Sequence, residues 1–70
     1  MEQLRNSGII SKEEYVGKTI EDATKWANDG GFVVRIVETD GIQHMLDMSV
    51  DARRLNFRVS FGRVTDVFGG

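Results

Sequence analysis

The sequence predicts a small α+β domain, in which one helix packs on a small mixed β-sheet and a long exposed loop joins two strands. Three observations favour this fold class. One segment has apolar residues at helical spacing between well-marked ends, and three later runs have the composition of β-strands. The segment between the first two of these runs is too long for a hairpin turn. With 70 residues and no cysteine, the chain must rely on one compact core without disulfide bonds.

The first part of the chain predicts an arm and then a helix. Residues 1–14 are polar and have no sustained period, so we expect a loosely ordered arm, or a short irregular helix, before a domain over residues 15–70. Thr19 is a good N-cap for a helix over residues 19–29, and Asp22 makes a variant of the capping box. Gly30 and Gly31 end this helix, as a left-handed C-cap does. Its apolar face contains Ile20, Ala23 and Ala27, with Trp26 packed at the flank.

Strands are expected at residues 32–38, 54–60 and 63–68, with a turn through Phe61 and Gly62 between the last two. Because side chains alternate across a strand, each run has one core-facing set. In the first run this set is Phe32, Val34 and Ile36, and Val33, Arg35 and Val37 lie on the other face. In the second run Leu55, Phe57 and Val59 point inward, and Arg54, Asn56 and Arg58 point outward. A connection of this length lets the first two strands pair in parallel, with the loop along one edge.

Composition limits the function classes. A formal net charge of −2 argues against a nucleic-acid-binding surface, which is normally basic. No apolar run approaches the roughly 20 residues of a membrane span. No signal peptide precedes the domain, so we expect a cytoplasmic protein, with secretion after removal of a leader left open.

Several possible chemistries fail on spacing. Residues 16–19 read VGKT, but a phosphate-binding loop needs a glycine where this chain has Lys12, so a helix N-cap is favoured. His44 has carboxylates nearby without the spacing of a zinc site, and we expect an exposed loop histidine. Ser49 and Ser60 lack the partners of a catalytic nucleophile. The chain is also barely large enough to enclose a pocket. The sequence therefore predicts a binding protein, with no enzymatic activity, cofactor or metal.

The loop of residues 41–53 is the strongest candidate for a binding element. It carries Ile42, Met45, Leu46 and Met48, where a plain solvated loop would be polar. A long loop is costly to order, so a protein that keeps one usually uses it. An extended segment with a projecting apolar side chain suits a protease cleft, provided that the loop is stiff. Asp47 is a plausible acceptor and Arg54 a plausible donor for the bonds that would stiffen it.

An ordered series of segments resembles one known family. The series is YVGKTIEDATKWA at the helix, VRIVETDG at the first strand, MLDM in the loop, RRLNFRV at the next strand and RVTDVFGG at the end. Together they resemble the potato inhibitor I family of serine-protease inhibitors, which includes eglin and the barley chymotrypsin inhibitor, over roughly residues 15–70. The RLN triplet is similar to a related group of small bacterial inhibitors, which usually carry two cysteines that this chain lacks.

The resemblance implies roles for particular residues. Leu46 would be the primary specificity residue for a subtilisin-like or chymotrypsin-like enzyme, with the scissile bond between Leu46 and Asp47. Met45 and Met48 would occupy flanking subsites. Arg54 matches the first supporting arginine, whose partners include Asp47, and Asn56 stands at the second supporting position. The loop is longer than that of eglin, so Met45 and Met48 remain alternative specificity residues.

Other interpretations use the same residues differently. The loop could fold back, so that Met45, Leu46 and Met48 complete a small core. Arg54 and Arg58 could lie on an ordinary solvated sheet face. The fold could also serve a non-inhibitory adaptor or regulator, which binds another protein through this loop or a sheet edge.

Overall fold

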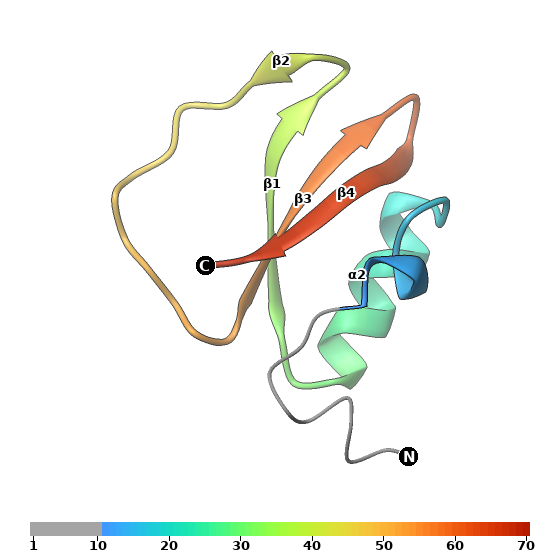
Figure 1. Ribbon diagram of the computed structural model, residues 1–70, viewed down its shortest axis with the longest axis horizontal. Helices are drawn as coiled ribbons and strands as arrows, with labels where there is room; N and C mark the ends of the chain where they lie inside the picture. Colours follow the sequence, from blue (N-terminus) through green and yellow to red (C-terminus); the bar gives the residue numbers. More distant parts are fainter. Residues whose placement is uncertain (1–10) are drawn as a thin grey trace.

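The computed structural model describes residues 11–70, and most of the expected N-terminal arm lies outside the described residues. In chain order the elements are η1 (Lys12–Glu14), α2 (Ile20–Asp29), β1 (Val33–Thr39), β2 (Ile42–Gln43), β3 (Arg54–Ser60) and β4 (Arg63–Gly69). The strands form one sheet in the order β2-β1-β3-β4, with α2 packed against it (Figure 1). Strands β1 and β3 are parallel, whereas the other two pairs are antiparallel. The predicted α+β fold is confirmed.

Helix α2 begins and ends where the sequence predicts. At its start, Thr19 is the N-cap, and its hydroxyl oxygen accepts a hydrogen bond of 3.2 Å from the Asp22 N–H. At its end, Gly31 has a φ of +90°, a conformation that a residue with a side chain rarely adopts. The Phe32 N–H then donates to the Ala27 carbonyl oxygen at 3.0 Å. A left-handed glycine with this bond is a Schellman C-cap. It turns the chain directly into β1.

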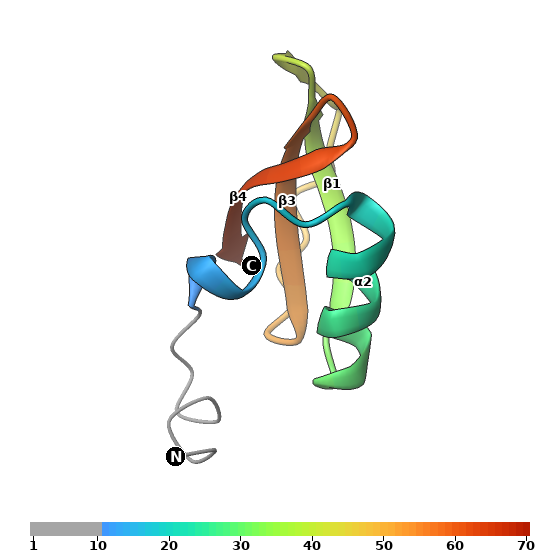
Figure 2. The same ribbon diagram turned by 90° about the vertical axis from the view of Figure 1, so that its right-hand side faces the viewer.

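The core lies between α2 and one face of the sheet (Figure 2). Ala23 and Ala27 are fully buried, and their small side chains let the helix approach the strands closely. Phe57 at the centre of β3 is also fully buried, and its ring centroid lies 5.7 Å from that of Tyr15. The strand residues that complete this core are Leu55, Val59, Val64 and Val67, with Phe32, Val34 and Ile36 partly buried against them. The alternation predicted for the first two strands therefore holds on this face.

Two tight turns with the same backbone conformation lie side by side. Asp40 and Gly41 have φ values of 51° and 83°, and they join β1 to the short strand β2. Phe61 and Gly62 have φ values of 51° and 79°, and they join β3 to β4. The Phe61 N–H donates to Asp40 Oδ1 at 2.7 Å, so the two turns are bonded to each other. Positive φ at both central residues is typical of type I′ hairpins.

Strand β2 changes the expected extent of the loop. The sequence predicted an exposed loop over residues 41–53, but Ile42 pairs with Thr39 and Gln43 pairs with Glu38. This strand lies along the outer edge of β1, and the segment that connects it to β3 is residues 44–53, called loop 44–53 below.

Candidate functional site

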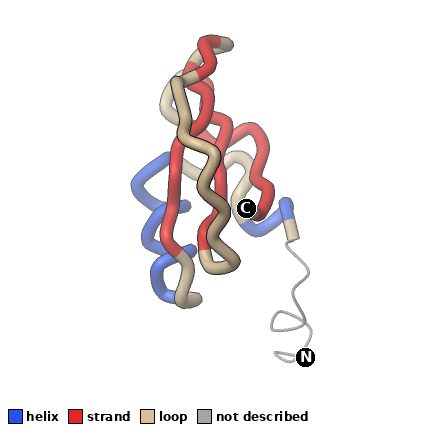
Figure 3. Tube along the Cα trace, turned by 90° about the vertical axis from the view of Figure 1, so that its left-hand side faces the viewer, coloured by secondary structure: helices blue, strands red, loops and turns tan. Residues whose placement is uncertain are grey.

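Loop 44–53 lies on the side of the sheet away from α2. Figure 1 shows the helix on one side of the strands and the loop on the other, and Figure 3 shows the loop in front of the strands with the helix behind. Every residue of the loop is exposed. Met45 is 99% exposed and Met48 is 95% exposed, whereas Leu46 is only 42% exposed. The two methionine side chains therefore project into solvent, and they do not complete a core.

Met48 lies at a bend between two residues that are bonded to each other. Asp47 Oδ1 accepts a hydrogen bond of 3.1 Å from the Ser49 N–H and another of 2.6 Å from the Ser49 hydroxyl. These bonds lower the pKa of Asp47, the hydroxyl more than the backbone N–H, and the charges of Arg35 and Arg54 lower it further. The carboxylate therefore stays ionised and bonded at neutral pH. The bonds fix the backbone on both sides of the Met48 side chain.

Arg54 supports the loop through Ser49. Its Nη2 donates to the Ser49 carbonyl oxygen at 2.8 Å, and both terminal nitrogens lie 3.4 Å from the Ser49 hydroxyl oxygen. The same Nη2 donates to the Gly70 carbonyl oxygen at 2.9 Å, which links the loop to the end of β4. The sequence led us to expect Asp47 as the partner of Arg54. Arg54 instead bonds to Ser49, and it acts on Asp47 only through its charge.

Asp47 forms an ion pair with Arg35 on β1. The resemblance to the inhibitor family implied no role for Arg35. Arg35 Nη1 lies 3.5 Å from Asp47 Oδ1, and Arg35 Nε donates to Asn56 Oδ1 at 2.9 Å. Asn56 Nδ2 in turn is 3.4 Å from the Phe68 carbonyl oxygen on β4, to which it donates. Arg35 and Asn56 are direct partners in the parallel β1–β3 register. Asn56 therefore orients the Arg35 side chain, which holds Asp47.

The Asn56 side chain is buried on the loop side of the sheet. Asn56 is only 1% exposed, although it lies on the face away from α2 as the alternation predicts. The Arg35 side chain and the end of β4 cover Asn56. Its amide oxygen accepts from Arg35, and its amide nitrogen donates to the Phe68 carbonyl oxygen. A buried amide with partners for both its oxygen and its nitrogen fixes the groups around it.

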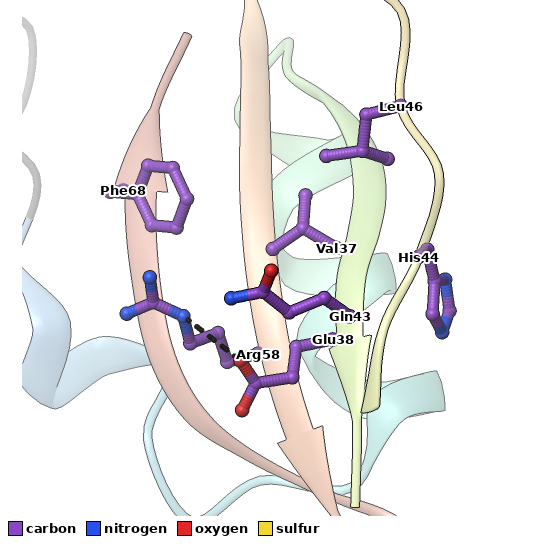
Figure 4. A pocket seen from close by; sticks show the side chains of 7 residues that line it. All are labelled: Val37, Glu38, Gln43, His44, Leu46, Arg58 and Phe68. Atoms are coloured by element: carbon purple, nitrogen blue, oxygen red, sulfur yellow. Dashed lines mark ion pairs between the residues drawn. The ribbon is translucent and has the colours of Figure 1, made fainter. Parts of the chain in front are cut away.

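Leu46 leans toward the sheet beside a shallow hollow of about 170 Å³. In Figure 4 its side chain points from the loop toward Val37 and Phe68, whereas His44 points away. Val37 is 7% exposed although it lies outside the main core, at a bulge where the β1–β3 register shifts. Of the residues that the fold-back interpretation named, Leu46 alone is turned toward the sheet. The hollow is lined by Val37, Glu38, Gln43, His44, Leu46, Arg58 and Phe68.

Arg58, expected on a solvated sheet face, is paired with its neighbours. Its Nη1 lies 3.0 Å from Asp66 Oδ2, its Nε lies 3.7 Å from Glu38 Oε1, and its guanidinium carbon is 5.2 Å from the centre of the Phe68 ring. The side chain is 43% exposed, so these contacts add little stability. Glu38, Arg58 and Phe68 are among the residues that line the hollow.

The other sequence candidates occupy ordinary positions. His44 is exposed, and its Nε2 is hydrogen-bonded to the Thr39 hydroxyl at 2.9 Å. Trp26 lies at the helix flank, where its Nε1 donates to Glu14 Oε1 at 3.0 Å. Within residues 11–70 no group of His, Cys, Asp and Glu side chains is arranged to hold a metal ion. In the same part of the chain, no helix has the length and apolar character that crossing a membrane requires.

Comparison of the chain with protein-family models, with curated proteins and with solved structures gave no match.

Proposed function

We propose that this protein is a substrate-mimicking inhibitor of a subtilisin-like or chymotrypsin-like serine protease, with loop 44–53 as its reactive loop. One observation carries the proposal. Met48 projects an apolar side chain that is 95% exposed from a short segment whose two flanking residues are bonded to each other and to the sheet. The hydrogen bonds and the ion pair of Asp47 and Ser49 therefore hold the backbone on both sides of this exposed apolar side chain.

The supports give the loop the property that an inhibitor needs. An extended segment binds a protease cleft through its backbone, and a projecting side chain fills the specificity pocket. A loop that is ordered before binding loses little entropy when it binds. After cleavage, bonds on both sides of the cut would hold the two new ends together, so that the peptide bond can form again. The Asp47–Ser49 bonds and the Arg54–Ser49 bonds supply this restraint on the two sides of residue 48.

The geometry favours Met48 over Leu46 as the specificity residue. Leu46 is turned toward Val37 and Phe68, and it would have to leave this hollow to enter a protease pocket. Met48 is already directed into solvent, and the backbone carbonyl of the next residue is held by Arg54. In this register the scissile bond is Met48–Ser49, and Met45, three residues earlier, reaches an outer subsite. This is the longer-loop alternative that the sequence left open.

The test is a titration of the purified protein into fixed amounts of subtilisin and of chymotrypsin, with a chromogenic substrate as the readout. We expect stoichiometric inhibition, with the chain intact or nicked only at Met48–Ser49 when its mass is followed over time. Met48→Ala should weaken inhibition by roughly 30-fold or more, because truncating a central apolar anchor costs about 2–4 kcal/mol. Leu46→Ala is the matched variant on the same loop, and it should cost less than about 1 kcal/mol of binding free energy.

Two results would contradict this proposal in different ways. Rapid digestion of the loop without inhibition, or no interaction with either protease, rejects the inhibitory function and favours the adaptor alternative. Inhibition with a nick at Leu46–Asp47 keeps the function but returns the register to the one that the resemblance implied.

A further inference from the structure

The two methionines of loop 44–53 present their sulfur atoms to solvent. Met45 is 99% exposed and Met48 is 95% exposed, although methionine is among the residues most often buried in protein cores. Leucine and methionine have similar volumes, so an apolar protease pocket would accept either side chain. A thioether adds one property that leucine lacks, which is reversible oxidation.

We propose that Met48 is a redox switch of the reactive loop, an inference that rests on the proposed function and deepens it. The oxidant is a peroxide such as hydrogen peroxide. The thioether sulfur attacks one peroxide oxygen, the O–O bond breaks, and the products are methionine sulfoxide and one molecule of water. The sulfur loses two electrons and the peroxide gains them. Methionine sulfoxide reductase reverses the reaction, with a dithiol that becomes a disulfide and releases the oxygen as water.

Oxidation would change the side chain that enters the protease pocket. The sulfoxide is polar and chiral, and an apolar pocket offers its oxygen no hydrogen-bond donor. A polar group buried without a partner weakens an interaction by roughly ten- to a hundredfold. The oxidised inhibitor therefore releases its protease, and reduction restores the complex.

The switch would act on binding and leave the fold intact. The Met48 side chain is almost fully exposed, and the core cluster contains neither of the loop methionines. The supports of the loop are bonds of Asp47, Ser49 and Arg54, none of which uses the sulfur of Met48. Oxidation of Met48 should therefore leave the thermal unfolding midpoint unchanged while inhibition falls.

The experiment compares the wild-type protein with Met48→Leu and Met45→Leu. Each protein is treated with hydrogen peroxide, sulfoxides are located by peptide mass, and inhibition of subtilisin is compared with that of the same protein before treatment. Met1 is present in all three proteins, so its oxidation is matched. Inhibition by the wild type and by Met45→Leu should weaken roughly ten- to a hundredfold. Met48→Leu should change by less than about fivefold, because Met45 contacts only an outer subsite.

The untreated proteins separate failure of the switch from failure of the function. If untreated wild type does not inhibit, the proposed function fails and the switch falls with it. If untreated wild type inhibits and the protein with sulfoxide at Met48 inhibits equally well, the switch alone is overturned. Equal weakening of Met48→Leu and wild type would also overturn it, because the sensitive methionine would then be another one. Recovery of inhibition on treatment with methionine sulfoxide reductases and a dithiol is the expected final step.

Discussion

The two faces of the sheet are built from different interactions. The face toward α2 is apolar, and Phe57, Leu55 and Val67 there are 1% exposed or less. The face toward loop 44–53 depends on directional bonds, in which Arg35, Asn56 and Arg54 connect the loop to three strands and to the end of the chain. The first face supplies most of the stability through burial. The second face fixes the conformation of loop 44–53, and its exposed contacts add little to the free energy of unfolding.

Magnitudes support this division. Burial of a large apolar side chain is worth about 1.5–3 kcal/mol, whereas an exposed ion pair is worth about 0–1 kcal/mol. The Arg35–Asp47 pair belongs to the second class, because the Asp47 side chain is 76% exposed. Substitutions on the helix-covered face should therefore act mainly on the free energy of unfolding, and those of exposed loop supports mainly on the order of the loop. The buried Asn56 should affect both.

The largest effect is expected from Phe57→Ala on the helix-covered face. Removing a fully buried phenylalanine should lower the free energy of unfolding by about 3–5 kcal/mol. A chain of this length has roughly 4–10 kcal/mol in total, so the variant should be partly or wholly unfolded. Urea denaturation followed by circular dichroism measures the change. A loss below about 1 kcal/mol would mean that the core does not dominate stability.

Asn56→Leu tests whether Asn56 and Arg35 are energetically coupled on the loop side of the sheet. The substitution keeps the number and branching of the side-chain heavy atoms, but Arg35 Nε and the Phe68 carbonyl oxygen lose their partner. We expect a loss of about 1–3 kcal/mol in the free energy of unfolding. Adding Arg35→Met removes the stranded donor, so the double variant should be more stable than the sum of the single changes predicts. A coupling of about 0.5 kcal/mol or more supports the network, and additivity contradicts it.

The helix-covered face could be predicted because its signals are local. The cap at Thr19, the glycines after residue 29 and the alternation along β3 each specify structure within a few residues. Strand β2 was missed, although Asp40-Gly41 is a strong hairpin signal between Thr39 and Ile42. The predicted loop over residues 41–53 included this hairpin signal.

The loop-side network could not be predicted from the same local patterns. Arg35 reaches Asp47 only because β1 and β3 pair in parallel with Arg35 opposite Asn56, a register that periodicity does not specify. The burial of Asn56 depends on the Arg35 side chain and on the path of β4. Arg54 donates to Ser49, the residue after the bend at Met48, and no local pattern specifies Ser49 over Asp47 as its acceptor. Each of these contacts joins residues from several segments of the chain, which local sequence patterns do not bring together.

Arg35→Ala should affect the order of the loop more than the stability of the fold. The Asp47 pair is exposed, so its loss should lower the free energy of unfolding by less than about 1 kcal/mol, with a further cost from the freed Asn56 oxygen. The matched control is Arg63→Ala, whose Nη1 donates to the Gly17 carbonyl oxygen at 2.8 Å, away from the loop. Backbone ¹⁵N relaxation should show increased motion at Met48 and Ser49 in Arg35→Ala alone. Equal motion in the two variants would mean that Arg35 is not a support of the loop.

The smallest effect is the response of the loop to acid, and it follows from the lowered pKa of Asp47. The Ser49 hydroxyl is the largest cause of that shift, so the ionised carboxylate is the form that holds the loop. A lowered pKa means that the support is fully present above the ordinary value of 3.8 and is lost as the pH falls through the lower value of the folded protein. Loop order should therefore stay constant from about pH 7 to about pH 5 and decrease only below about pH 4. Amide relaxation at Met48 across this range measures the change.

Asp47→Asn separates this local titration from the acid response of the whole fold. Asp66 on β4 also has a lowered pKa, chiefly because Lys12 bonds to it, so overall stability falls in the same acidic range. The amide oxygen of an asparagine can still accept the Ser49 bonds, but it neither titrates nor carries the charge that pairs with Arg35. The variant loop should be slightly more mobile at neutral pH, and its mobility should follow global stability alone as the pH falls. An identical acid response in the wild type and in Asp47→Asn would show that burial on the helix-covered face, and not the Asp47 carboxylate, controls the loop.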